Sequence, residues 1–456
     1  MSERPNIVVT IADDQQADAI GTLESTDVIT PTLDKMVGKG VYFTQAHHFG
    51  SPHGAVCAPS RAMLHTGKNY FNLPTSAHSE AFLKQLSEDQ IQKDQKSLNL
   101  IPTLGELLGQ HGYKTFGTGK WHNGTILFNK SFQDGGNIFF GGMSSHYKVP
   151  VHQYDTTGEY ASNKLTIGNK FSTNLFLSTA LEFINTYDDP DPFFLYVSFT
   201  APHDPRTPPS QYKKMYPVNK MKVPPNFMSE HPFDNGCMYD IRDELLAPWP
   251  RTEEVIKKHI ADYYGMITHM DWAIGQISNA LERNKFSDNT LVIHTGDHGL
   301  ALGQHGLLGK QNLYEHSVKV PLIITGPDIP TRNVNALVYQ HDLFPTLLES
   351  ANIQVPDKCE FKSLWGLLKN KPTQLRNTIY SSYTEFQRMV KNDRFKLVRF
   401  YAKEGKGVNR FQLFDYVNDP YELNDLINDA TYNDLTRDLK SELDRWMRAT
   451  NDPLAT

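Results

Sequence analysis

Residues 57–61 read Cys-Ala-Pro-Ser-Arg and join a thiol to a proline turn, an expected helix start and an arginine. A cysteine in that setting can be a nucleophile with a lowered pKa, because a helix start and a nearby cation favour the thiolate. Arg61 lies four residues after Cys57, one helical turn on, and can therefore share its face. Taken alone, the pattern is about equally compatible with an ordinary buried cysteine.

Carboxylates follow two short apolar runs. Asp13 and Asp14 come after residues 6–12, and Asp297 with His298 follows residues 290–295. Oxygen ligands favour Ca²⁺, or Mg²⁺, over zinc, and a neutral imidazole from His298 can complete the set. Asp13 and Asp14 by themselves are more typical of a turn or a helix cap, so the metal site requires all four residues to meet.

Further side chains can bind an anion or move a proton: Lys120, His122, His203 and Lys310. Each alone is more often a solvated or structural side chain, and the chain has 18 histidines. Asp204 and Arg206 follow His203 closely in His-Asp-Pro-Arg, so they are candidate contacts to a substrate, and an arginine can pair with a carboxylate or a sulfate. A solvated loop is an equally good interpretation of that segment.

The elements that must position these residues are visible as patterns. Apolar, β-branched and aromatic runs predict buried strands at residues 6–12, 41–45, 114–118, 193–200, 290–295 and 321–325. A proline start or apolar spacing of three to four predicts helices at residues 102–110, 173–187, 253–283 and 341–351. Such alternation predicts a parallel sheet covered on both faces, with ligands beyond the carboxyl ends of its strands.

Two segments depart from this alternation of strands and helices. The proline-rich residues 202–250 predict a long irregular loop, which is usually functional or disordered. Residues 377–386, 387–391, 394–401 and 409–414 predict an antiparallel meander, followed by a helix at 434–448. We therefore expect a larger domain at residues 1–370 and a smaller α+β domain at residues 371–456.

Together the motifs resemble those of the type I, formylglycine-dependent sulfatases. Residues 57–61 with Thr66 and Gly67 resemble the Cys-x-Pro-Ser-Arg signature of that family. The other matching segments stand in the family's order, at residues 13–14, 119–122, 202–203, 296–299, 309–310 and 413–422. The resemblance implies an alkaline-phosphatase-like α/β fold, which is a large mixed, mainly parallel sheet between helices, with a smaller C-terminal α+β subdomain.

The resemblance also implies a mechanism. A formylglycine-generating maturation enzyme would oxidise Cys57, and one hydroxyl of the resulting aldehyde hydrate would attack sulfur. Loss of the proton from the second hydroxyl would then re-form the aldehyde and expel sulfate. Ca²⁺ or Mg²⁺ would be held by position 57 and by the carboxylates and imidazole, acting as a Lewis acid.

Each remaining residue takes a role from the same resemblance. Arg61 would hold the hydrate, and Lys120 and Lys310 would contact the sulfate oxygens as point charges. His122 would take the proton of the hydrate, and His203 would donate to, or hydrogen-bond, the leaving alcohol oxygen.

The expected substrate is a sulfated saccharide. Residues 54–67 and 303–316 resemble bacterial sulfatases that act on glycosaminoglycans and other sulfated glycans. Many family members have Asn where this chain has His298, and in this respect it resembles iduronate-2-sulfatase-like enzymes. An exo-acting enzyme on uronate 2-O-sulfate is the subclass that these features favour.

Three alternatives stay open on the sequence. A phosphonate monoester or phosphodiester hydrolase of the same superfamily can use the same nucleophile and metal, because phosphate and sulfate share a tetrahedral shape. A non-catalytic sulfoglycan-binding protein would keep the fold without maturing Cys57. A cysteine hydrolase would use the Cys57 thiol directly and need no metal.

Composition limits the partners. The 456 residues carry a formal charge of −6, which predicts no nucleic-acid partner. No apolar run reaches the roughly 18 residues of a membrane span, and no signal peptide is visible, so the chain as written is expected in the cytoplasm. Removal of a signal peptide would instead indicate the periplasm or secretion. Cys237 and Cys359 are expected to be structural thiols, since three cysteines make no disulfide framework.

Overall fold

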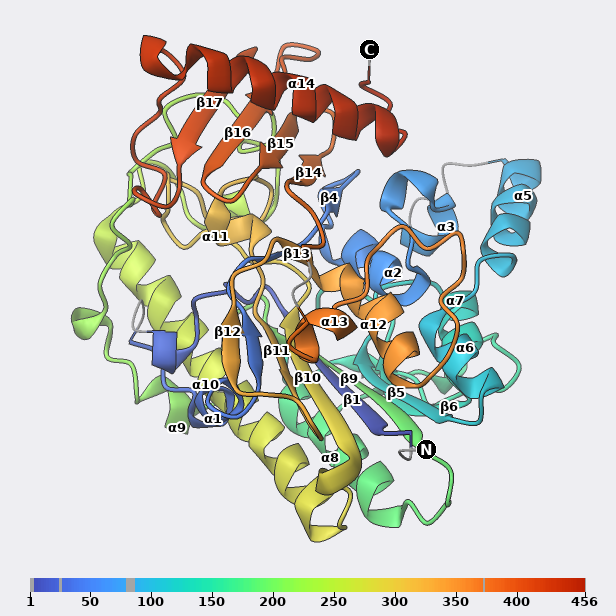
Figure 1. Cartoon of the computed structure of the whole chain (residues 1–456). Coiled ribbons are helices and arrows are strands. Elements are labelled where there is room, and N and C mark those ends of the chain that lie inside the picture. The colour runs from blue at the N-terminus through green and yellow to red at the C-terminus, as the bar shows by residue number, and fades with distance from the viewer. Residues whose placement is uncertain (1–3, 24–26, 79–86, 372–373, 456) are drawn as a thin grey trace.

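A central sheet lies between two layers of helices, and a smaller sheet stands at one end of the molecule (Figure 1). This arrangement is seen in a computed structural model that describes residues 4–23, 27–78, 87–371 and 374–455. In Figure 1 the chain enters the central sheet at the lower right through its first strand and ends at the top, beside the helix that covers the smaller sheet.

The central sheet has the strand order β12-β2-β11-β10-β1-β9-β5-β6. Strands β10, β1, β9, β5 and β6 form one parallel block, whereas β11 runs antiparallel to both β10 and β2. The strands are β1 (Asn6–Asp13), β2 (Val41–Phe43), β5 (Lys114–Lys120), β6 (Asp134–Phe139), β9 (Phe193–Pro202), β10 (Thr290–Gly296), β11 (Leu322–Thr325) and β12 (Arg332–Val334).

Parallel pairing brings the carboxyl ends of these strands to one edge. Asp13 pairs with Pro202, and Ala12 pairs with Gly296, so β1, β9 and β10 end side by side. On the other side of β9, Gly119 pairs with Ser198 just before β5 ends at Lys120. The polar residues that follow these strands are therefore forced together.

The two faces of the sheet are covered by different helices, because successive strand residues point to opposite sides. Ile7 and Val9 of β1 join one core, whereas Val8 joins the other. The first face is covered by α2 (Cys57–Thr66), α6 (Leu104–Gln110), α7 (Thr125–Ser131), α12 (Leu343–Ser350) and α13 (Trp365–Leu368). The second face is covered by α1 (Pro31–Val37), α8 (Ser172–Thr186) and α10 (Glu253–Arg283).

The smaller sheet is antiparallel except for one strand that comes from early in the chain. Its order is β17-β16-β15-β14-β4, and α14 packs on it. Its elements are β4 (Gly50–Ser51), β14 (Ile379–Tyr383), β15 (Gln387–Lys391), β16 (Phe395–Phe400), β17 (Arg410–Asp415) and α14 (Asn433–Ala449). β4 pairs in parallel with β14, so a strand from near residue 50 forms one edge of this C-terminal sheet.

Short elements complete the fold. They are α3 (Thr75–His78), α5 (Glu88–Asn99), α9 (Ser210–Lys213), α11 (Glu315–Val318) and the paired strands β3 (Ala46–His47) with β13 (Val338–Tyr339) and β7 (Pro150–Val151) with β8 (Thr166–Ile167). In the described part of the chain, no helix is both long and apolar enough to cross a membrane.

The predicted fold class is confirmed, with local corrections. The sheet is mixed and mainly parallel, and α10 and β15 span the predicted residues. The predicted helix at 102–110 begins only at Leu104, because the Thr103 hydroxyl caps it by accepting from the Glu106 backbone. The antiparallel strand β11, which returns beside β10, makes the sheet mixed, as the family resemblance implied.

Gly50 is predicted to be essential for joining the two sheets. Its φ is +116°, and a Cβ there would lie 1.9 Å from the Ser382 carbonyl oxygen. We expect Gly50→Ala to lower the free energy of unfolding by about 3 kcal/mol or more, from backbone strain plus the clash. Urea unfolding measures this loss.

Gly405→Ala is the matched control. Gly405 has φ +80°, but a Cβ there meets nothing within 4 Å. Only the strain remains, and a loss of about 1 kcal/mol is expected. Equal losses for the two variants would contradict the role given to the β4–β14 contact.

Candidate active site

Helix α2 places Cys57 at the meeting point of the strand ends. The helix begins at Cys57 and ends at Gly67, whose φ of +66° suits a left-handed cap. Cys57 is 2% exposed, so its thiol sits inside the molecule at the first turn of a helix. The helix start that the sequence predicted here is confirmed.

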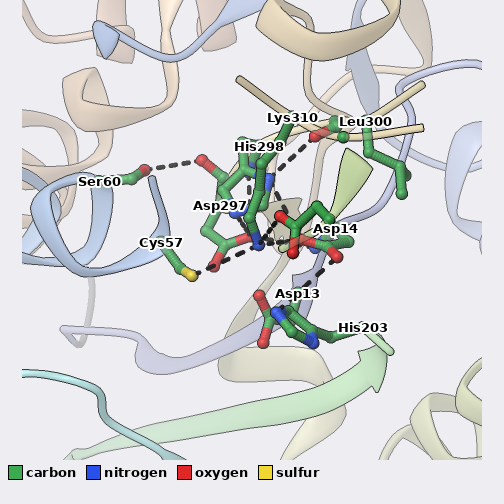
Figure 2. A network of polar contacts seen from close by, with 12 residues as sticks. Asp13, Asp14, Cys57, Ser60, His203, Asp297, His298, Leu300 and Lys310 are labelled. Carbon is green, nitrogen blue, oxygen red and sulfur yellow. Dashed lines mark hydrogen bonds and ion pairs between the residues drawn. The ribbon is translucent and has the colours of Figure 1, made fainter. Parts of the chain in front are cut away.

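Three carboxylates surround this position. Asp13 is the last residue of β1, Asp14 follows it with φ +73°, and Asp297 follows β10. The Asp14 backbone N–H donates to Asp297 Oδ1 at 3.2 Å, which fixes the turn after β1 against the end of β10. Figure 2 shows these side chains converging with His298 and Cys57. All are buried, so their charges require compensation.

Arg61 provides the first compensating charge. Its Nε and Nη2 lie 3.1 Å and 3.0 Å from Asp297 Oδ2, and Nη1 donates to the Lys120 carbonyl at 2.8 Å. Nη1 also contacts the Ser198 hydroxyl. Burial disfavours the guanidinium charge, but Asp297 outweighs this and raises the pKa of Arg61 above its usual range. Arg61 therefore links α2 to β5, β9 and β10.

Two lysines lie beside the thiol, and each is bound to a different aspartate. Lys120 Nζ binds the Asp13 carboxylate and lies 3.7 Å from Cys57 Sγ. Lys310 Nζ donates to Asp14 Oδ1 at 2.8 Å and lies 3.8 Å from Cys57 Sγ (Figure 2). Burial alone would raise the pKa of the Cys57 thiol, but Lys120 and Lys310 hold it well below its usual range. The site is built to stabilise negative charge at position 57.

The same cluster has the donor set for a hard cation. Ligand atoms of Asp13, Cys57, Asp297 and His298 lie within 4.8 Å of one another, as do those of Asp13, Asp14 and His203. Asp13 Oδ1 is buried and has no hydrogen-bond partner among the described residues. An oxygen donor left over in a buried acidic cluster fits Ca²⁺ or Mg²⁺.

The tautomer of His298 fits the same interpretation. Its Nδ1 lies 2.9 Å from the Gly299 carbonyl, which can only accept, so Nδ1 carries a proton. Burial lowers the pKa of His298, but Asp297, whose Oδ1 lies 3.5 Å from Nε2, outweighs this and the pKa is raised to about 9. A bound cation would have to displace the Nε2 proton, which would leave the lone pair on that atom. Backbone contact therefore orients this imidazole as a ligand.

The two other predicted histidines reach the site from different loops. His203 follows β9, and its Nε2 lies 4.0 Å from Asp14 Oδ2. Its Nδ1 donates to the Asp204 carbonyl at 2.8 Å. His122 follows β5 with φ +62°, and its Nδ1 is buried without a hydrogen-bond partner in the described residues. Burial and then Lys120 hold the pKa of His122 well below its usual range, which leaves a neutral imidazole.

Asp204 and Arg206 separate in the structure. The Asp204 carboxylate receives two hydrogen bonds, of 2.9 Å and 3.0 Å, from Arg242, and its Oδ1 lies 3.3 Å from His203 Nδ1. Arg206 instead contacts His259, with Nη1 3.2 Å from Nδ1. Asp204 therefore contacts the histidine and also lines a neighbouring cavity, which it shares with Arg206.

Sequence reasoning missed Arg242 and Asp243. Asp243 Oδ2 lies 3.8 Å from Lys310 Nζ and accepts from Gln311 at 2.7 Å, and Arg242 Nε donates to Asp243 Oδ1 at 3.1 Å. Both residues come from the predicted loop at 202–250. Adjacent opposite charges in a loop are common, so no local signal distinguished this pair.

Comparisons with known proteins can now be set beside this geometry. A sequence model of the family described as "Sulfatase" matches residues 5–353, and one described as "N-sulphoglucosamine sulphohydrolase, C-terminal" matches residues 303–449. An arylsulfatase of Clostridium perfringens is 27% identical over 94% of this chain and 91% of its own. An N-acetylglucosamine-6-O-sulfatase of Bacteroides thetaiotaomicron is 23% identical over 99% of this chain and 88% of its own.

A solved structure has the same fold. It is a complex of a protein with its substrate, D-glucosamine-2-N,6-O-disulfate, and superposes with a TM-score of 0.80 at 21% identity, covering 99% of both chains. The shared architecture confirms the alkaline-phosphatase-like fold that the sequence motifs implied.

Arg61 is expected to be the main structural cation of the site. Replacing it by Met leaves Asp297 buried without its partner, so Arg61→Met should lower the free energy of unfolding by about 3–5 kcal/mol. Arg437→Met is the control, because Arg437 and Asp434 form an ion pair of 2.8 Å at the surface, where the expected loss is below about 1 kcal/mol. Denaturant unfolding that gave similar losses for both would contradict this assignment.

Proposed function

We propose a substrate and a mechanism for this chain, which belongs to the sulfatase family and is a sulfuric ester hydrolase. The proposed substrate is a sulfated carbohydrate cleaved by exo action, with uronate 2-O-sulfate as the favoured class. The relative that is an N-acetylglucosamine-6-O-sulfatase supports a sugar substrate. One observation carries the mechanism: Cys57 lies between two lysine ammonium groups, over a cluster of buried carboxylates.

In the proposed mechanism, Cys57 is converted to formylglycine by a maturation enzyme, and its hydrate is the nucleophile. The surroundings of position 57 support this, because they stabilise an anionic oxygen there as they stabilise a thiolate. The start of α2 adds the positive end of a helix dipole. A sulfuryl group bound beside position 57 would meet the same charges.

Lys120 and Lys310 are assigned to the sulfate oxygens. Their Nζ atoms lie 3.7 Å and 3.8 Å from Cys57 Sγ. A sulfuryl group bonded at position 57 would therefore place its oxygens close to both ammonium groups. Lys120 is already paired with Asp13, and Lys310 with Asp14 and Asp243, so both side chains are held in place before substrate arrives. Arg61 is assigned to orient position 57 from the next turn of the same helix.

Proton transfer is assigned to the two histidines. His122 is the proposed base, and its lowered pKa supports this because a neutral imidazole can accept a proton. His203 is the proposed donor to the leaving alcohol oxygen. Burial and then Lys310 hold the pKa of His203 well below its usual range, and Nδ1 already donates to the Asp204 carbonyl, so this role requires that substrate binding protonate Nε2. The Asp204 carboxylate, 3.3 Å from His203 Nδ1, would stabilise the imidazolium that donates. This gives Asp204 a supporting task, and Arg206 remains the proposed substrate contact.

Ca²⁺, with Mg²⁺ as the other candidate, is the proposed metal. Asp13, Asp14, Asp297 and His298 would hold it together with position 57, and the unpartnered Asp13 Oδ1 supports this set. A bound cation would act as a Lewis acid toward a sulfuryl oxygen. The same carboxylates also bind Lys120, Lys310 and Arg61, so the proposed metal ligands hold the neighbouring cationic side chains in position.

The central test is turnover on matched esters. We expect the matured protein to hydrolyse 4-nitrophenyl sulfate faster than a phenylphosphonate ester, because the site is assigned to a sulfate monoester. Mass spectrometry of the peptide across residues 56–61 should find an aldehyde in place of the thiol. Cleavage of the phosphonate without cleavage of the sulfate would overturn the proposal in favour of a phosphonate hydrolase.

Cys57→Ser is the matched variant for that experiment. Serine can attack sulfur once but has no second hydroxyl to expel sulfate, so multiple turnover should fall at least about 10³-fold. Sulfated enzyme is the expected trapped species. A thiol that persists together with activity inhibited by alkylation would instead favour a cysteine hydrolase.

Divalent cation should stabilise the fold. At 100 times its dissociation constant, Ca²⁺ is expected to add about 2.7 kcal/mol, or a rise in Tm of about 3 °C. Asp13→Asn should abolish the rise, whereas Asp425→Asn should keep it, because Asp425 pairs with Arg410 away from the site. Thermal unfolding with Ca²⁺, with Mg²⁺ and with a chelator measures these shifts, and equal Tm values in all three would remove the metal from the proposal.

A further inference from the structure

A cavity of about 340 Å³ adjoins the proposed active site. Its lining includes Asp204, Arg206, Lys258, His259 and Asp262. Asp204 connects the two places, because its Oδ1 lies 3.3 Å from His203 Nδ1. Arg206 is also close enough to Asp14 to help lower the pKa of that carboxyl. Asp204 thus lies between the residues around position 57 and this cavity, which places the cavity directly beside the proposed site.

The charges that line this cavity are unequally compensated. Asp204 is bound by Arg242 at 2.9 Å, and Asp262 is paired with Lys213 Nζ at 3.2 Å. Neither Arg206 nor Lys258 has a carboxylate oxygen within 4.0 Å in the part of the chain that the structure describes. The direct ion pairs of both acids are thus made by residues outside the lining, whereas Arg206 acts on Asp204 only from a greater distance. The guanidinium of Arg206 and the ammonium of Lys258 therefore remain open to direct contact with an anionic ligand.

Arg206 is the centre of this positive charge. It is half-buried, and its Nε is enclosed without a hydrogen-bond partner in the described residues. A guanidinium has five N–H donors, and here one is directed to His259 Nδ1 at 3.2 Å while the group lies 5.8 Å from the Tyr263 ring centroid. Enclosing an arginine with so few acceptors costs free energy, which an anionic ligand would offset.

His259 extends the donor set. Arginine can only donate, so His259 Nδ1 accepts and the ring proton is on Nε2. Burial, reinforced by Arg206 and Lys258, lowers the pKa of His259 to about 4. The imidazole is therefore neutral, does not repel Arg206, and keeps one N–H to donate. Lys258 lies exposed at the rim on the same helix, α10.

We propose that this cavity is a second anion subsite, in which Arg206, Lys258 and His259 bind a carboxylate or second sulfate of the sugar whose sulfate ester lies at position 57. The inference rests on the proposed function and narrows its substrate class to sugars with two anionic groups. At about 340 Å³ the cavity has the size of a small ligand site. The guanidinium of Arg206 can donate two parallel hydrogen bonds, a geometry that matches two oxygens of a carboxylate or a sulfate.

Calorimetric titration of the Cys57→Ala protein tests this without turnover. The first pair of probes is a 2-O-sulfated uronate and its carboxyl-reduced form, and the second pair is glucosamine 2-N,6-O-disulfate and glucosamine 6-O-sulfate. The doubly anionic member of one pair should bind about tenfold more tightly, as expected for a charge-assisted hydrogen bond. Tighter binding of the 2-O-sulfated uronate than of its carboxyl-reduced form would identify a carboxylate as the second anion. Tighter binding of the disulfate than of the 6-O-sulfate would identify a sulfate.

Three variants in the Cys57→Ala background localise the effect. Arg206→Gln should reduce the preference to less than about threefold, and Lys258→Gln should weaken it by about threefold. Lys257→Gln is the control, because Lys257 is the neighbouring lysine and pairs with Glu253. Since Lys258 is exposed, its substitution tests the subsite even if Arg206→Gln fails to fold.

The outcomes separate this inference from the proposed function. Equal affinities within both pairs, no binding of any probe, or a preference that survives both Arg206→Gln and Lys258→Gln would overturn the subsite. Absence of sulfate ester hydrolysis by the matured wild-type protein, with the binding preference intact, would overturn the proposed function alone.

Discussion

Neutralising three buried carboxylates beside one thiol is the constraint on which the rest of the site depends. Asp13, Asp14 and Asp297 are each at most 2% exposed, so none can rely on water to stabilise its charge. Parallel strands bring them together, and Lys120, Lys310 and Arg61 compensate them from β5, a following loop and α2. Because each cation is already held by a carboxylate, the positive charge beside position 57 is preorganised.

The C-terminal sheet contributes to this site through the loop that carries Lys310. Glu315 lies five residues later, and its carboxylate pairs with Lys391 of β15 at 2.6 Å and Lys396 of β16 at 3.3 Å. Lys396 also pairs with Glu422 at 2.6 Å, and all these side chains are largely buried. With β4 completing the same sheet, residues 371–456 are coupled to the catalytic part. The boundary near residue 370 stays a prediction.

The sequence predicted most of this site because its residues follow strands whose apolar patterns are strong. Asp13 and Asp297 could be placed at one sheet edge from that pattern alone, since parallel pairing leaves few alternatives. β6 escaped notice, because Asp134–Phe139 contains two glycines and lacks a β-branched run. Arg242 was not predicted either, since its partners come from tertiary packing of an irregular loop. Local patterns identify elements, whereas contacts between loops depend on the whole fold.

Arg242 connects the irregular loop at residues 202–250 to the proposed active site. It holds Asp204 and Asp243 together, and these contact His203 and Lys310 respectively. The loop from 202 to 250 therefore supports the proposed proton donor on one side and, on the other, the lysine that we assign to the sulfate oxygens. Arg206 lies beyond these contacts and has no carboxylate oxygen within 4.0 Å among the described residues, but its charge acts on the Asp14 and Asp204 carboxyls from a greater distance. A protein with a formal charge of −6 can thus attract an anionic sugar, because its acidic residues near the site are internally paired and its unpaired cations line the cavity beside it.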